Sequence, residues 1–186
     1  MICVAAFEPF GGRSRNRAWE AASLLTGATL GGHPVEVHQL PVAYAQIRAR
    51  IDELVAKQPN VLLLVGESGG ARTLELETVA LNVAHAPSPD NAGQRPIDQA
   101  LDAGGPLARR IQFAPDPVLR ASFAAGVPCA RSHHAGTFLS NAALYHALAT
   151  TGPKVAFVHV PAHWPWARNR RAARGLSAIA EALLHV

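Results

Sequence analysis

Residues 61–70 read VLLLVGESGG, five consecutive apolar residues followed by a turn rich in glycine. An unbroken apolar run of this length is typical of a strand that is buried on both faces, as in the centre of a parallel sheet. Ligands of such sheets bind at the carboxyl ends of the strands, so the turn Gly66–Gly70 is a candidate binding segment. The turn has neither the lysine of a phosphate-binding loop nor the spacing of a dinucleotide-binding loop.

Short apolar runs and amphipathic stretches alternate on both sides of this strand. The pattern predicts further strands at residues 2–6, 35–40, 127–131 and 155–160, and a strand or hairpin arm at residues 73–83. It predicts helices at residues 19–25, 44–57, 118–125, 137–149 and 168–184, and a long loop rich in proline and glycine at residues 87–106. This order predicts an α/β fold with a mostly parallel sheet and helices on both faces.

The composition excludes several classes of protein. The chain has 186 residues, of which 49% are hydrophobic and 16% charged, as expected for one folded domain over residues 1–186. The net charge is +4, but basic residues are dense only at Arg168–Arg174 and aromatic residues make up 6%, so no nucleic-acid partner is expected. Cys3 and Cys129 form neither a disulfide framework nor a zinc motif. No apolar stretch approaches 18 residues and no signal peptide precedes the first strand, so we expect a cytoplasmic protein without a membrane segment.

Two loops after predicted strands carry candidate binding and catalytic residues. Phe7 and Phe10 follow the first strand and either line a small apolar pocket or belong to the core. Ser140 falls in the first turn of a predicted helix, where free N–H groups and the helix dipole favour a developing negative charge. This position suits a nucleophile, although it also suits an ordinary small helical residue.

Acid–base candidates lie on two other predicted strands. His159 stands at the carboxyl end of VAFVHV, and is either a general base or a hydrogen-bonded core histidine. Glu75 and Glu77 face the same side of their strand, where one of them orients a histidine or both are solvated. His133 and His134 are adjacent and point to opposite sides, so they do not form a metal-binding pair.

The chain as a whole resembles the pyroglutamyl peptidase I family. The resemblance is carried by an ordered set of motifs: FEPFGG, LPVAYAQ, VGESGGARTLELETVALN, PDNAGQ, HAGTFLSNAALY and VHVP. It implies a three-layer α/β/α sandwich and a peptidase that removes N-terminal pyroglutamyl residues from peptides with a Cys–His–Glu triad, without metal or cofactor. It also implies a homo-oligomer, a dimer or a tetramer.

The resemblance places the family's glutamate at Glu77, its histidine at His159 and its nucleophilic cysteine at the position of Ser140. Neither Cys3 nor Cys129 lies where a nucleophile is needed. Three explanations of Ser140 stay open: an engineered, inactivated form, a natural serine variant, or a homologue with another role.

The resemblance also implicates residues that bind the substrate. They are Phe7, Phe10, Asn16, Val42, Glu67, Phe138 and Leu139. The segment Ala84–Ser88 departs from the family pattern and lacks an arginine that relatives carry there. Two alternatives therefore stand beside the peptidase: an amidase that acts on another acyl group in specialised metabolism, and a non-catalytic homologue that binds a lactam or a peptide end.

Overall fold

The computed structural model describes the backbone of residues 1–186 and the side chains of all of them except Trp166. Its strands are β1 (Ile2–Phe7), β2 (Thr29–Leu30), β3 (His33–Leu40), β4 (Val61–Ser68), β5 (Leu74–Glu77), β6 (Val79–Leu81), β7 (Ala108–Arg110), β8 (Cys129–Ser132) and β9 (Lys154–Pro161). Its helices are α1 (Arg17–Ser23), α2 (Tyr44–Ala56), α3 (Pro115–Ala124), α4 (Leu139–Ala147) and α5 (Asn169–Ala182), with short 3-10 turns η1 (Trp166–Arg168) and η2 (Leu183–His185). No helix within this described part is long and apolar enough to cross a membrane.

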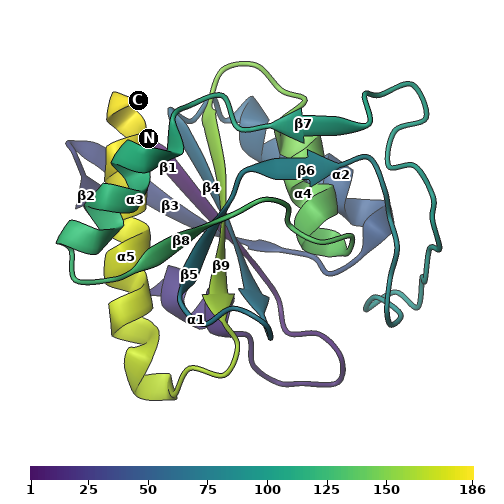
Figure 1. Ribbon diagram of the computed structural model, residues 1–186, viewed down its shortest axis with the longest axis horizontal. Coiled ribbons are helices and arrows are strands. Elements are labelled where there is room, and N and C mark those ends of the chain that lie inside the picture. Colours follow the sequence, from purple (N-terminus) through teal and green to yellow (C-terminus); the bar gives the residue numbers. More distant parts are fainter.

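A seven-stranded sheet with the order β2-β3-β1-β4-β9-β5-β8 forms the middle layer (Figure 1). β4 lies between β1 and β9 and all residues of VLLLV are buried, as predicted from the apolar run. Strands β3, β1, β4 and β9 run parallel to one another. β5 and β8 are parallel to each other but run opposite to β9, and β2 runs opposite to β3. The prediction of an α/β fold around a mostly parallel sheet is confirmed.

Helices cover both faces of the sheet, which gives three layers (Figure 1). Alternate residues of each strand point to opposite faces. Leu63 and Val65 pack with apolar residues of α1, α3 and α5, whereas Leu62 and Leu64 pack with α2 and α4. Gly66 continues the second series, so it faces the layer that contains α4.

The predicted strand or hairpin arm at residues 73–83 divides into two strands of different sheets. β5 joins the central sheet, whereas β6 pairs with β7 in a separate two-stranded sheet that packs beside α4. β7 was not predicted because its three residues, Ala-Arg-Arg, show no apolar alternation. The long loop after β6 is fastened to α2 by Asp90, whose carboxylate accepts a hydrogen bond from the Tyr44 amide at 2.8 Å.

Candidate active site

The predicted site residues line one pocket of about 410 Å³. It lies where β1, β4 and β9 end and α4 begins. All ten predicted residues belong to its wall: Phe7, Phe10, Asn16, Val42, Glu67, Glu77, Phe138, Leu139, Ser140 and His159. Further wall residues, not predicted as site residues, include Glu75, Pro87, Ser132 and His134. Of the segment Ala84–Ser88, it is Pro87 that reaches this pocket.

Ser140 occupies the first turn of α4, as the sequence predicted. The helix begins at Leu139, and its first intrahelical bond is donated by the Ala142 amide to the Phe138 carbonyl at 3.1 Å. Among the described side chains none caps the amides of the first turn. These N–H groups and the positive end of the helix dipole are therefore available to an anion that forms next to Ser140.

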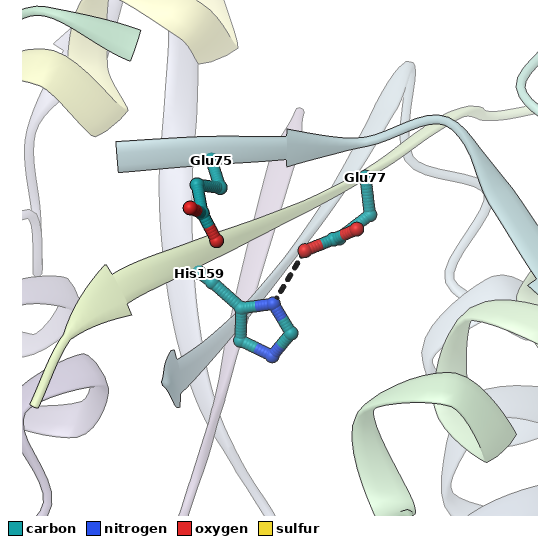
Figure 2. Close-up of side chains that lie close together, drawn as sticks. All are labelled: Glu75, Glu77 and His159. Carbon is teal, nitrogen blue, oxygen red and sulfur yellow. Dashed lines mark hydrogen bonds and ion pairs between the residues drawn. The ribbon is translucent and has the colours of Figure 1, made fainter. Parts of the chain in front are cut away.

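Ser140, His159 and Glu77 form a hydrogen-bonded relay. The Ser140 hydroxyl lies 3.1 Å from Nε2 of His159. On the other side of the ring, Nδ1 of His159 lies 2.6 Å from Oε1 of Glu77 (Figure 2). Glu77 is 2% exposed and His159 is 8% exposed. With the Nδ1–H donating to the carboxylate, Nε2 accepts the hydroxyl proton. This is the geometry of a nucleophile, a general base and a group that orients the base.

Gly66 makes the close approach of the relay to β4 possible. A methyl group on Gly66 would lie 3.0 Å from Oγ of Ser140, 3.2 Å from Cδ2 of His159 and 2.8 Å from Cζ of Phe157. The sequence predicted the turn Gly66–Gly70 as a candidate binding segment. At Gly66 the close neighbours are instead the side chains of the relay, a spacing set by how α4 packs on the sheet.

Glu75 adds a second carboxylate beside the relay. β5 pairs Glu75 directly with His159, and both glutamates point toward the imidazole side of the sheet (Figure 2). Ligand atoms of Glu75, Glu77 and His159 lie within 4.8 Å of one another. Burial and then the charge of Glu77 raise the pKa of the Glu75 carboxyl above its usual value. The sequence left open which glutamate contacts a histidine; the contact is made by Glu77.

Glu75, Glu77 and His159 lie close enough together to hold a metal ion, but two of them already bond to each other. Nδ1 of His159 and Oε1 of Glu77 bond to each other, which leaves Glu75 and the buried Oε2 of Glu77 without a hydrogen-bond partner among the described residues. The expectation that the site uses no metal stays a prediction.

Aromatic rings form the wall on the other side of the relay. The ring centroids of Phe10 and Phe138 are 6.2 Å apart, and Tyr44 meets Phe138 edge to face at 5.9 Å. Phe7 is buried and its ring lies 6.5 Å from that of Phe157. These rings, together with buried Val42, make this end of the pocket apolar and uncharged.

Asn16 and Glu67 line the pocket but have their polar groups engaged elsewhere. Asn16 caps α1 by accepting from the amides of Ala18 and Trp19, and its own amide donates to the Glu8 carbonyl at 3.0 Å. The Glu67 carboxylate pairs with Arg13 and accepts the Arg17 amide at 2.8 Å. Neither side chain brings an unpaired charge to the aromatic end.

Asn141 was not predicted as a site residue, yet it holds the helix that carries Ser140 in place. Its fully buried amide accepts from the Leu81 N–H at 2.8 Å and donates to the carbonyls of Leu81 and Val83, both at 2.9 Å. These bonds tie β6 to the first turn of α4, next to Ser140. The only signal in the sequence was the asparagine of the motif AGTFLSN.

The two cysteines lie away from Ser140, His159 and Glu77. Cys129 pairs with Leu74 in the β5–β8 register and packs with the α5 side of the sheet, opposite to the relay. Cys3 is buried in β1 beneath α2. Burial raises the pKa of each thiol to about 12, so both are protonated near neutral pH.

The comparisons with known proteins agree with this architecture. The sequence profile of the family described as Pyroglutamyl peptidase matches residues 1–170. The chain is 38% identical over 164 residues to the pyrrolidone-carboxylate peptidase of Chromobacterium violaceum, an alignment that covers 86% of this chain and 77% of the relative. The crystal structure of pyrrolidone carboxyl peptidase from Thermus thermophilus matches with a TM-score of 0.89 at 30% identity, covering 97% of this chain and 99% of that one. That of pyroglutamyl peptidase I from Bacillus amyloliquefaciens matches with a TM-score of 0.93 at 27% identity, covering 100% and 95%. The chain therefore belongs to the pyroglutamyl peptidase family and is a hydrolase.

Proposed function

We propose that this chain hydrolyses the amide bond that follows an N-terminal pyroglutamyl residue, with Ser140 as nucleophile, His159 as general base and Glu77 as the group that orients His159. The observation that carries the proposal is the relay from Ser140 through His159 to buried Glu77, open to a pocket with an aromatic end. Membership of the family supports the same reaction.

The aromatic end of the pocket suits a pyroglutamyl group. This group is a flat, uncharged lactam without a free ammonium, so its site needs apolar walls and a few amide partners rather than an anion. Phe10 and Phe138 supply such walls. A free amino terminus would lose its hydration there without finding a paired charge, which disfavours ordinary peptides.

The reaction follows from the geometry of the relay. The Ser140 Oγ attacks the pyroglutamyl carbonyl as His159 Nε2 takes its proton, and the negative charge forms on the carbonyl oxygen near the free amides at the start of α4. His159 then gives the proton to the leaving nitrogen, and the peptide departs with a free amino group. Water, deprotonated by the same histidine, hydrolyses the acyl-enzyme, while Glu77 stabilises the imidazolium in both steps.

The hydroxyl at position 140 limits the rate. A thiol beside a histidine and a helix N-terminus is readily held as thiolate, whereas a hydroxyl must lose its proton during the attack. A relay built for the larger sulfur atom also leaves oxygen short of the carbonyl. We therefore expect slow turnover by the Ser140 chain and faster turnover by a Ser140→Cys variant.

Release of a chromogenic amine from a pyroglutamyl conjugate tests the proposal. The measurement compares the Ser140 chain with Ser140→Cys, and uses Ser140→Ala as the matched control without a nucleophile. In the Ser140→Cys background, His159→Ala should abolish turnover and Glu77→Gln should reduce it, because Glu77 acts through His159. A Ser140→Cys variant that is folded and no faster than Ser140→Ala would overturn the proposal.

Two further results would favour the alternatives to a pyroglutamyl peptidase. Faster cleavage of another acyl amide than of the pyroglutamyl conjugate favours an amidase. Binding of a pyroglutamyl peptide without turnover by any variant favours a non-catalytic binding protein.

We further propose that residues 1–186 form one pyroglutamyl-peptidase-like domain that assembles as a dimer or tetramer. A cytoplasmic location fits the two free thiols, Cys3 and Cys129.

A further inference from the structure

Three carboxylates line the pocket, and only one of them is left without a partner among the described residues. Glu67 is paired with Arg13 and the Arg17 amide, and Glu77 is bonded to His159. Glu75 is half-buried, lines the pocket and has no hydrogen bond or ion pair within the described part of the chain. An unpaired, half-buried carboxylate in a pocket is an attractive partner for a cation.

The strand order places Glu75 on the opposite side of His159 from the aromatic rings. β9 carries His159 and lies between β4 and β5, with β1 and its Phe7 beyond β4. On the β5 side, the pocket wall consists of Glu75 together with Ser132 at the end of β8 and His134 just after it. No helix packs over the Glu75 face of β8, where Ala130 is exposed among the described residues.

The chemistry of the relay places the leaving group on the β5 side of His159. Nε2 of His159 must reach the leaving nitrogen to protonate it, so that nitrogen lies at the imidazole. With the lactam ring among Phe10 and Phe138, the residue that follows the scissile bond extends over β5 and β8. Its side chain is then the part of the substrate nearest to Glu75.

We propose that Glu75 makes the enzyme selective for peptides that carry a cationic side chain, of lysine or arginine, directly after the pyroglutamyl residue. This inference rests on the proposed function. A cation offsets the unpaired negative charge of Glu75, whereas an aspartate or glutamate at the same place meets like charge from both Glu75 and Glu77. The raised pKa of Glu75 agrees with this arrangement, because it shows that the site disfavours the carboxylate when no cation is bound.

The expected preference is moderate, because Glu75 is partly open to solvent. Ion pairs at such positions change binding by about two- to fivefold at physiological salt, and by about tenfold where water is partly excluded. The preference should weaken as salt is added, since the pair is accessible to screening ions.

The test compares three peptides that differ at one residue: pyroglutamyl-Lys-Ala-amide, pyroglutamyl-Gln-Ala-amide and pyroglutamyl-Glu-Ala-amide. Cleavage is followed by chromatography in the Ser140→Cys background, with a chelator present. We expect kcat/KM to fall in the order Lys, Gln, Glu, with about three- to tenfold between the first and the last. Glu75→Gln should make the three peptides equal within about twofold. The matched control Glu181→Gln removes the same charge from α5, on the other face of the sheet, and should leave the order unchanged.

Each outcome decides a separate point. Cleavage of all three peptides at equal rates, or an order that persists in Glu75→Gln, overturns the role of Glu75 and leaves the proposed function standing. A preference that appears only when the chelator is omitted and Zn²⁺ is added also overturns it, since a metal ion at Glu75 would then be responsible. Calorimetric binding of the same peptides to Ser140→Ala, which has no nucleophile, supplies a readout without turnover. If Ser140→Cys cleaves none of them but binding keeps the order, the proposed function fails and the selectivity of Glu75 stands.

Discussion

Substituting Gly66 by alanine tests whether the spacing between β4 and the relay sets the activity. The added methyl group would lie 3.0 Å from Oγ of Ser140 and 2.8 Å from Cζ of Phe157. Phe157 is fully buried and Gly66 belongs to the central sheet, so neither neighbour moves easily. The Ser140 side chain and the His159 ring must give way by several tenths of an ångström, which disturbs the hydrogen bond between them.

The expected loss of kcat is about 100-fold, the size typical of a catalytic group displaced by less than an ångström. Overpacking at Gly66 should cost about 1–3 kcal/mol of stability. For a chain of this size each kcal/mol lowers Tm by about 2–4 °C. In the Ser140→Cys background the collision is stronger, because sulfur is larger than oxygen.

The assay is turnover of the chromogenic pyroglutamyl conjugate together with thermal denaturation. Gly69→Ala is the matched control, since Gly69 is exposed in the turn that directly follows β4 and its added methyl group meets nothing within 4 Å. Gly69→Ala should retain its kcat and its Tm. If Gly66→Ala, folded at the assay temperature, kept the kcat of Gly69→Ala, the reasoning from spacing would be refuted.

Three other perturbations follow from single contacts. Asn141→Ala leaves the N–H of Leu81 and two partly buried carbonyls without their partner and should destabilise the chain by about 3–5 kcal/mol, measured by denaturant unfolding. A loss below about 1 kcal/mol would contradict the role of Asn141 in holding α4 against β6. Because burial raises the pKa of Cys3 and of Cys129 to about 12, iodoacetamide at pH 8 should add nothing to the folded Ser140 chain and one group to Ser140→Cys, counted by mass spectrometry. The raised pKa of Glu75 means that the folded chain binds this proton more tightly than the unfolded chain, so stability falls as the pH rises through that pKa. Glu75→Gln should therefore raise Tm at pH 7, with the gain vanishing toward pH 4.

The strands and helices with strong periodicity could be predicted from the sequence. VLLLV lies at the centre of the sheet, and α2 and β3 begin and end within two residues of their predicted bounds. Apolar alternation does not encode the direction of a strand, so nothing indicated that β5 and β8 run opposite to β9. The division of residues 73–83 between two sheets depends on β7, which has no pattern of its own.

The residues of the candidate site could be predicted from the sequence, whereas the distances between them could not. The motifs supplied residues for every wall of the pocket, and the structure brings all ten together. The need for glycine at position 66 was not predictable, because it arises from the distance between α4 and β4. The sequence showed that Glu75 and Glu77 share a face, but not which of them bonds to His159. The β5–β9 register sets Glu75 directly across from His159, yet the imidazole turns toward Glu77, the residue across from Phe157, and bonds to it.

The reversed direction of β5 explains how this short strand places two carboxylates, one bonded and one free, beside His159. In the parallel part of the sheet, site residues lie at the carboxyl ends of the strands or in the loops beyond them, as with His159 near the end of β9 and Phe10 after β1. β5 runs antiparallel to β9 and pairs with it beside His159. Its side chains therefore contact the imidazole from the neighbouring strand, on the same face of the sheet. Residues two apart on one strand face the same way: Glu77, deeper in the sheet, is buried and bonds to Nδ1, whereas Glu75 is nearer to the open edge and stays unpaired. The same alternation that sets Glu77 against His159 thus leaves the carboxylate of Glu75 free at the pocket, where the proposed selectivity would have the substrate supply the cation that the described residues do not.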